Sequence, residues 1–337
     1  MKMTKVGIPR ALLYYQYYPM WRTFFEELGA EVVVSPPTTQ AMLSSGSSRV
    51  VAETCLPVKI FLGHVLSLVG KCDCVFIPAI RSVKRKVYNC SKFLGLPDMT
   101  RAVIPESPPI LEIDIDVNRG KRVLYQAIYR LGRHFNWNPL RVKQASIAAW
   151  QAHLNYQQLM SRHGLTPHQA IARISTTSEA EPEAHPNSLA SVRAAIAVIG
   201  HPYLLYDEYV NHRLIHRLEQ THNRVLTPEM LTVDELESAT VRLAGKARWT
   251  YDAEVVGAGG HYLESGADGV IGIMTFGCGP DSLMMAMVRR YASRLKTAPF
   301  TSLTLEEHTA DGGMLTRLEA FLDMIYRRRR RQAEVCV

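Results

Sequence analysis

Short apolar segments that alternate with helical patterns constrain the fold of this chain more than any other feature. Three runs rich in valine and isoleucine are predicted strands: Lys5–Ile8, Glu31–Val34 and Cys74–Ile77. Between them, Tyr17–Leu28 and Pro57–Val69 carry apolar residues at helical spacing, and Pro78 is expected to end the third strand. This order predicts a parallel sheet with helices on both faces. Continuous rather than alternating apolar strands agree with burial on both sides.

The second half of the chain repeats the plan of the first. Ala194–Ile199 is a predicted strand, Phe300–Leu305 is the last one, and a loop through Gly313 then leads into a helix that begins at Met314. Matching features follow or precede the strands of both halves: Pro9 and Pro202, Tyr14 and Tyr206 at predicted helix starts, and Gly63-His64 and Gly260-His261. We predict two related α/β halves, residues 1–118 and 192–331. The alternative is that the two halves are unrelated and resemble each other only because all doubly wound α/β segments look alike.

Two segments separate these halves. Residues 119–174 have apolar side chains at helical spacing, among them Leu124, Ile128 and Leu131, and form a predicted helical insert. Residues 175–191 are polar, contain proline and lack periodicity, which indicates a flexible linker.

The charge balance argues against a dedicated nucleic-acid-binding domain. The net charge is +8, and the tail from Arg327 to Val337, with five arginines and one glutamate, carries half of it. The remaining +4 is spread over 326 residues, so we expect no strongly basic face on the body of the protein. For the arginines of the tail, a solvated helix end is favoured over contact with RNA or a membrane surface.

Targeting signals are absent from the sequence as given. No apolar run reaches the roughly 18 residues that a membrane helix needs. Gly7 and Pro9 interrupt the N-terminal segment before a signal-peptide core can form. Six cysteines do not make a secreted disulfide framework, so a cytoplasmic protein is expected, with cysteines as core residues, nucleophiles or metal ligands.

Ligands of open parallel sheets bind beyond the carboxyl ends of the strands. That rule selects four segments: Pro9-Arg10, Tyr88–Cys90, Gly277–Asp281 and Glu307-His308. If the two halves face each other, the cleft between them is the expected site. His201, in Gly-His-Pro-Tyr, lies in a similar loop and is either a proton donor or substrate contact or a structural histidine, whereas His64 is expected to pack inside a helix.

Three cysteines fall at these places. Pro57 suits the first turn of a helix, which puts Cys55 at a helix N-terminus, where the dipole would lower a thiol pKa. Cys90 follows a basic loop, and Cys278 follows a buried strand with glycine on each side. The alternative is three inert buried thiols. The remaining cysteines are not candidates: Cys72 and Cys74 are expected on a buried strand, and Cys336 in a frayed tail.

Several motifs in this order resemble the single-chain relatives of the 2-hydroxyacyl-CoA dehydratases. They are Gly7-Ile-Pro-Arg-Ala-Leu-Leu13, Glu53-x-Cys-x-Pro-Val-Lys59, Gly63-His-Val65, Phe76-Ile-Pro78, Cys90-x-Lys-Phe-Leu-Gly-Leu-Pro-Asp-Met99, Gly200-His-Pro-Tyr203, Phe276-x-Cys-Gly-Pro-Asp-Ser282, Glu307-His-Thr309 and Thr316-Arg-Leu-Glu-Ala-Phe321. The resemblance covers nearly the whole chain and is weakest in the insert and linker. One departure is Ser91, where relatives commonly carry proline.

This resemblance implies flavodoxin-like (Rossmann-like) halves around an iron–sulfur cluster. Cys55, Cys90 and Cys278 match the cysteines that hold a 4Fe–4S cubane with one open iron, and related proteins hold a double-cubane cluster. It also implies an ATP-dependent activase, itself an iron–sulfur protein, which delivers low-potential electrons. The dehydratases use such an electron to expel water from a 2-hydroxyacyl-CoA through a ketyl radical.

The leading hypothesis is therefore an oxygen-sensitive, dehydratase-like iron–sulfur protein with an activase partner and an acyl-CoA substrate. Arg10, Asp281 and His308 are candidate catalytic residues, and Lys59 is a candidate supporting residue. The second hypothesis is a non-catalytic cluster scaffold or electron carrier that serves a partner enzyme. The third is a metal-free α/β binding module whose cysteines are core residues. A dimer is compatible with each.

Overall fold

The computed structural model describes residues 3–175 and 192–335, which form two compact units. The first unit contains Met1–Gln158 with Arg248–Thr250, and the second contains Leu159–Ala247 with Tyr251–Val337. The predicted linker, apart from Ser175, lies outside the described residues. Within the described ranges, no helix is both long and apolar enough to cross a membrane.

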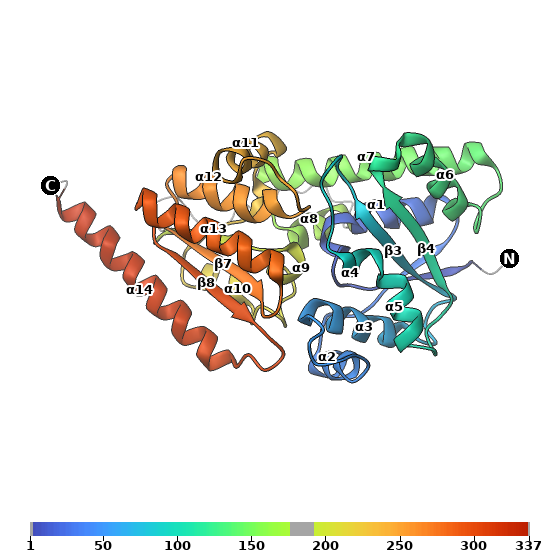
Figure 1. Ribbon diagram of the computed structural model, residues 1–337, viewed down its shortest axis with the longest axis horizontal. Helices are drawn as coiled ribbons and strands as arrows, with labels where there is room; N and C mark the ends of the chain where they lie inside the picture. Colours follow the sequence, from blue (N-terminus) through green and yellow to red (C-terminus); the bar gives the residue numbers. More distant parts are fainter. Residues whose placement is uncertain (1–2, 176–191, 336–337) are drawn as a thin grey trace. The chain divides into compact units, whose positions relative to one another are not determined.

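A four-stranded parallel sheet organises the first unit (Figure 1). Its elements are β1 (Lys5–Ile8), α1 (Tyr14–Glu27), β2 (Glu31–Val34), α2 (Gln40–Ser47), α3 (Leu56–Leu68), β3 (Cys74–Ser82), α4 (Ser91–Leu94), α5 (Leu96–Val103), β4 (Ile110–Asp116), η1 (Val117–Arg119), α6 (Lys121–Gly132) and α7 (Pro139–His163). The strand order is β2-β1-β3-β4. The boundary between the units falls inside α7, after Gln158.

Helices cover both faces of this sheet, as the continuous apolar strands predict. On one face, Trp21 and Phe25 of α1 pack against Phe76 of β3 in tilted and edge-to-face arrangements, with ring centroids 4.6 and 5.0 Å apart. On the other face, β1 passes so close to α3 that a Cβ on Gly7 would lie 3.2 Å from the Leu68 side chain. Helix α1 stops where Gly29 takes a φ of +83°, a backbone conformation that glycine adopts without strain.

The second unit has the same sheet order, β6-β5-β7-β8, with all strands parallel. Its elements are α8 (Pro167–Ser175), β5 (Ala195–Ile199), α9 (Pro202–Leu205), α10 (Leu214–Gln220), β6 (Arg224–Leu226), η3 (Pro228–Met230), α11 (Val233–Ala244), η4 (Ala253–Gly257), α12 (Ala258–Glu264), β7 (Gly269–Thr275), α13 (Gly279–Leu295), β8 (Phe300–Leu305) and α14 (Asp311–Val335). Two α/β halves of one topology are thus confirmed.

Two glycines of β7 show how closely both faces of the second sheet are covered. A Cβ on Gly272 would lie 2.4 Å from the sulfur of Met285 in α13. A Cβ on Gly269 would lie 2.3 Å from Ile325 of α14. Because side chains alternate along a strand, these positions face opposite sides, so α13 and α14 sandwich the sheet.

One strand prediction is wrong, because β3 does not end at Pro78 but continues to Ser82. The Val75 N–H donates to Pro109 on the β4 side, so by alternation the nitrogen of Pro78 faces the β1 side. The pairing with β1 stops at Val75. Because no strand pairs with this side of Pro78, the missing N–H costs no hydrogen bond of the sheet, and the strand continues beyond the proline.

Other boundaries also differ from expectation. Tyr206 does not start a helix but caps the C-terminus of the four-residue helix α9. Helix α14 begins at Asp311 rather than after Gly313, and Cys72 precedes β3 instead of lying in it. The predicted helical stretch after residue 119 is confirmed by α6, α7 and α8.

Candidate functional site

Cys55 caps the N-terminus of α3, as Pro57 predicts. Its backbone is extended, with φ −62° and ψ 145°, and its carbonyl oxygen accepts hydrogen bonds from Val58 and Lys59. Burial nevertheless raises the pKa of the Cys55 thiol, and the neighbouring Cys90 raises it further. A hydrogen bond from Val58 N–H and the charge of Lys92 oppose this only partly. The expected lowering of the pKa is wrong, because desolvation outweighs the helix N-terminus.

Cys90 has a similar setting at the N-terminus of α4, with φ −56° and ψ 143°. Its electrostatic effect on Cys55 shows that the two thiols lie close enough to interact, although 35 positions separate them in sequence. Backbone hydrogen bonds hold the loop before Cys90 in place. Asn89 N–H donates to Arg81 O at 2.8 Å. Tyr88 N–H donates to Arg248 O, and Tyr88 O accepts from Thr250 N–H, both in the same unit.

The Asn89 side chain is the clearest sign that this place can hold a further group. The residue is buried, yet neither Oδ1 nor Nδ2 has a hydrogen-bond partner among the described residues. A buried amide without partners costs free energy unless something else satisfies it. Its Nδ2 could donate to a cluster sulfide beside Cys90, so the donor set of this loop fits an iron–sulfur cluster.

Cys278 lies in the second unit, where it caps the N-terminus of α13 three residues after β7. Gly277 before it takes a φ of +77°, and a Cβ on Gly279 after it would meet nothing within 4 Å. The backbone around this half-buried thiol is therefore open to a close ligand, as the flanking glycines predict. All three candidate cysteines are helix N-caps.

Behind Cys278, the second unit contains a buried imidazole and carboxylate. His201 Nε2 lies 3.1 Å from Asp281 Oδ1, although neither atom has the alignment of a hydrogen bond. Asp281 Oδ2 accepts from Thr275 N–H, and the His201 ring packs 4.3 Å from the ring of Tyr251. Burial lowers the pKa of His201, and the Asp281 and Asp252 carboxylates oppose this. The sequence singles out His201 and Asp281 but carries no signal for Tyr251.

Asp281, a predicted catalytic residue, is fully buried in the first turn of α13. Its carboxylate is enclosed between Thr275 and His201, so it can position neighbouring groups but cannot touch a substrate in this conformation.

Arg10 and Lys59, two predicted site residues of the first unit, make contacts within that unit. The Arg10 backbone N–H donates to Ser35 Oγ at 2.7 Å, and its guanidinium lies over the Tyr14 ring. Lys59 is buried, and its ammonium donates to the Ala52 carbonyl at 2.8 Å. Lys59 therefore supports the backbone just before Cys55, whereas Arg10 joins the loop after β1 to the residue that follows β2.

His64 confirms the structural interpretation. It is fully buried in α3, with Nδ1 2.8 Å from Ser35 Oγ and Nε2 2.9 Å from Thr38 Oγ1. Burial lowers its pKa to about 4, and the charge of Arg10 lowers it further, so the imidazole is neutral near pH 7.

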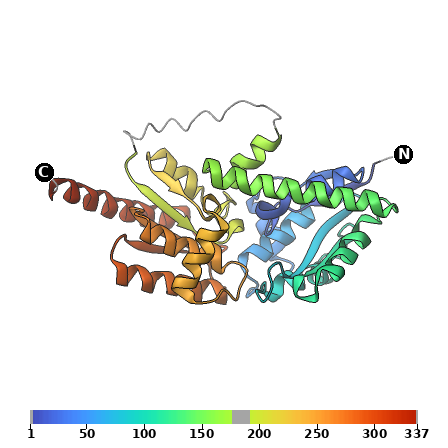
Figure 2. The same cartoon turned by 90° about the horizontal axis from the view of Figure 1, so that it is seen from above.

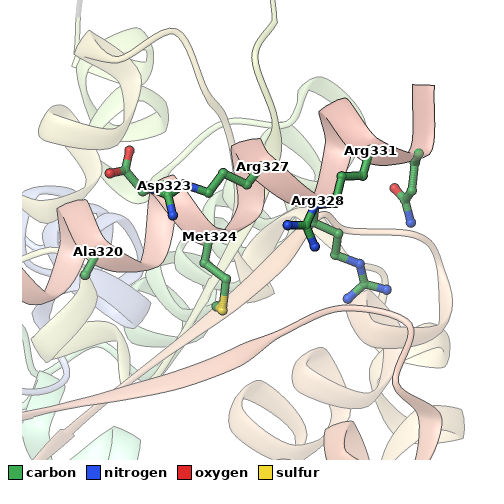
Figure 3. A pocket seen from close by; sticks show the side chains of 7 residues that line it. Ala320, Asp323, Met324, Arg327, Arg328 and Arg331 are labelled. Carbon is green, nitrogen blue, oxygen red and sulfur yellow. The ribbon is translucent and has the colours of Figure 1, made fainter. Parts of the chain in front are cut away.

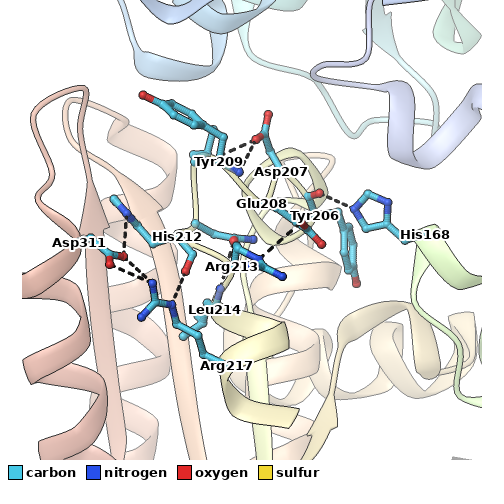
Figure 4. Close-up of polar contacts among 12 residues, drawn as sticks. His168, Tyr206, Asp207, Glu208, Tyr209, His212, Arg213, Leu214, Arg217 and Asp311 are labelled. Atoms are coloured by element: carbon cyan, nitrogen blue, oxygen red, sulfur yellow. Dashed lines mark hydrogen bonds and ion pairs between the residues drawn. The ribbon is translucent and has the colours of Figure 1, made fainter. Parts of the chain in front are cut away.

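His308, another predicted catalytic residue, lies on the loop after β8 with 84% of its side chain exposed, 3.6 Å from Glu307. A more ordered arrangement lies nearby in sequence, where Asp311 receives two hydrogen bonds from Arg217, at 2.8 and 2.9 Å, and lies 3.4 Å from His212 (Figure 4). This contact fixes the start of α14 to α10.

The arginine-rich end of α14 borders an open groove of about 1010 Å³ (Figure 3). Its lining residues all belong to this helix, and no predicted site residue is among them. Arg328 donates to the carbonyls of Lys296 and Thr297, and Arg329 pairs with Asp268. Part of the arginine run thus anchors the helix to its own unit.

Two further cysteines lie elsewhere, and Cys336 falls outside the described residues. Cys72 and Cys74 are half-buried at the amino end of β3, the opposite edge of the sheet from Cys90, and burial raises the pKa of Cys74 to about 11. Among the described residues, no three His, Cys, Asp or Glu side chains stand together as a ready-made metal site.

The chain matches a known protein family. The model of a family described as CoA enzyme activase uncharacterised domain matches residues 5–231, more than half of the chain. None of the curated proteins matches it.

Proposed function

Because this chain belongs to the CoA enzyme activase uncharacterised domain family, we propose that it is an iron–sulfur protein of the 2-hydroxyacyl-CoA dehydratase type. In this proposal it accepts low-potential electrons from an ATP-dependent activase. Cys55, Cys90 and Cys278 supply the thiolates for a 4Fe–4S or double-cubane cluster. The bound cluster would supply one-electron chemistry toward a CoA thioester.

The observation that carries the proposal is the pair of thiols in the first unit. Cys55 and Cys90 each cap the N-terminus of a helix, and the Cys55 thiol is close enough to Cys90 and Lys92 to interact with both electrostatically. Asn89, whose buried amide has no partner among the described residues, directly precedes Cys90 in the chain. The raised pKa of the Cys55 thiol does not prevent ligation, because a metal displaces the proton from a coordinating thiol.

A second candidate, a cluster scaffold or electron carrier without catalysis, is favoured by the environment of the predicted catalytic residues. Asp281 is enclosed and His308 is exposed, so within the second unit they do not form an acid–base pair around a substrate position. A carrier would keep the cluster signal unchanged when a 2-hydroxyacyl-CoA is added.

Iron and sulfide analysis after anaerobic reconstitution tests the proposal. We expect a brown protein with several irons per chain, and Cys90→Ser should lose most of this iron. Cys74→Ser is the matched control, because it removes another half-buried thiol from the same unit and should bind iron like the wild type. Iron-free wild type, or equal iron in both variants, would contradict the proposal.

A further inference from the structure

Helix α7 carries two stripes made mainly of apolar side chains, and only one of them is buried. The buried stripe packs into the first unit and consists of Val142, Ala145, Ala149, His153 and Tyr156. The Tyr156 hydroxyl donates to the carbonyl of Tyr15 at 2.6 Å, which fixes the helix against α1. One apolar stripe is enough to hold a helix on a protein surface, so the second stripe needs another explanation.

The second stripe, here called the α7 stripe, consists of Leu140, Lys143, Ile147, Trp150 and Leu154. Its members are separated alternately by three and four residues, the spacing of a coiled-coil seam. Leu140, Ile147 and Trp150 are 67, 60 and 56% exposed, which is high for large apolar side chains. Figure 2 shows α7 as one long helix, which gives this stripe a straight course.

Aromatic side chains extend the exposed surface at the α6–α7 corner. Trp137 is 72% exposed, and the Arg133 guanidinium lies 4.4 Å from its ring centre. Tyr125 of α6 is also exposed. Tryptophan, tyrosine and arginine are the residues that contribute most to binding energy at protein interfaces.

The chain segment that contains the α7 stripe carries acidic or basic side chains of one sign only. From Val117 to Gln158 the chain has seven lysines and arginines and no aspartate or glutamate. The low net charge of the 326 residues before the tail therefore hides a local excess of positive charge in this segment. Lys143 lies within the stripe, and Arg141 is exposed beside it.

We propose that the α7 stripe, with the α6–α7 corner, is a docking surface for a partner protein that presents an acidic amphipathic helix. The seam spacing fits one apolar helix face, and the surrounding positive charge fits an acidic flank. A second copy of this chain would bring another surface of the same sign. This inference is independent of the iron–sulfur proposal.

Other polyanions fit the surface less well. A single-stranded nucleic acid stacks its bases on aromatic rings, whereas Leu140 and Ile147 in the centre of the stripe are aliphatic. A membrane-surface helix buries a broad apolar face, whereas the opposite face of α7 is already packed against its own unit.

Fluorescence anisotropy with two designed peptides tests the proposal on the full-length protein. Both peptides are helices of about three heptads with leucine at the seam positions, one flanked by glutamate and the other by lysine. The acidic peptide should bind at least about tenfold more tightly than the lysine peptide, and added salt should weaken it. Ile147→Glu should reduce its affinity by at least about tenfold.

Gln144→Glu is the matched control, because it adds the same charge to an exposed position of α7 outside the stripe and should change the affinity less than about threefold. Equal binding of the two peptides, or unchanged binding by Ile147→Glu, would overturn the proposal. So would self-association of the wild type that Ile147→Glu abolishes, or tighter binding of poly(U) or anionic vesicles than of the acidic peptide.

Discussion

The two α/β units share one strand order but carry different chemistry where their helices begin. In the first unit, Cys55 interacts electrostatically with Cys90 and Lys92, whereas in the second unit Cys278 precedes by three residues Asp281, which lies buried against His201. The strand order is the same in both units, and the loops at the helix starts are not. The comparison teaches that the repeated scaffold fixes where a site can lie, while the loops decide which groups occupy it.

Matching glycines in the two units differ in how tightly they are packed, and this gives the largest expected effect. A Cβ on Gly63 of α3 would lie 2.1 Å from the Met42 carbonyl oxygen, which is backbone and cannot move aside. Gly63→Ala should cost about 4 kcal/mol or more and leave the first unit largely unfolded. Urea unfolding followed by tryptophan fluorescence measures this, because all four tryptophans belong to the first unit.

Gly260 of α12 supplies the control for this comparison. A Cβ there would lie 3.1 Å from a flexible methyl group of Leu243, which can yield. The helix also gains from replacing glycine, so Gly260→Ala should change stability by about 1 kcal/mol or less. Similar costs for the two substitutions would contradict the structural difference between the units.

The next effect is the acid sensitivity of the first unit. Burial lowers the pKa of His64 and of His153 to about 4, from an ordinary value of 6.5. The unfolded chain therefore binds more protons between these values, and stability is lost as the pH falls from 6.5 to 4, by about 3 kcal/mol for each histidine. Tryptophan-detected urea unfolding across this range should show the loss, and His64→Gln should remove about half of it. A pH-independent curve would contradict this account.

In the second unit, the titration of Glu229 changes stability in the opposite direction with pH, and we expect its effect to be smaller. Burial raises the pKa of Glu229 to about 7, and the Tyr206 hydroxyl, which donates to Oε2, opposes the rise. The residue is half-buried overall, but Oε1 is buried and has no hydrogen-bond partner among the described residues. The folded unit therefore holds the extra proton, and stability is lost as the pH rises from about 4.5 to about 7.

Glu229→Gln should accordingly gain about 2 kcal/mol over the wild type between about pH 4.5 and pH 8, after discounting for partial exposure. Amide hydrogen exchange of the second unit, corrected for intrinsic rates, measures the difference. The lowered pKa of His201 also makes the stability of this unit depend on pH. The contribution of Glu229 is therefore measured as the difference in stability between the wild type and Glu229→Gln at each pH. A constant difference across this range would refute the assignment.

The sequence predicted those parts of the fold whose signals are local. Lys5–Ile8, Glu31–Val34 and Phe300–Leu305 are strands as expected, and Pro57 correctly marks the start of a helix that Cys55 caps. A short apolar run or a proline in a first turn acts on its own neighbours, so its effect can be inferred without the rest of the chain.

Features that depend on distant partners were missed or misjudged. Strand β4 is an exception, because the alternating pattern of Ile110–Asp116 is a local signal that indicates a strand at the edge of a sheet. Pro78 lies inside a strand because β1 ends early, and Tyr251 reaches His201 from 50 positions away, so neither could be inferred from neighbouring residues. The raised pKa of Cys55 depends on burial by the whole unit.

The most direct test of the central claim is the iron and acid-labile sulfide content of Cys278→Ser, prepared anaerobically beside the wild type. The account predicts several irons per wild-type chain and a large loss, or a visibly altered cluster spectrum, in the variant, with the fold of the second unit retained. Equal iron and an identical spectrum in the two proteins would contradict a cluster that Cys278 helps to hold.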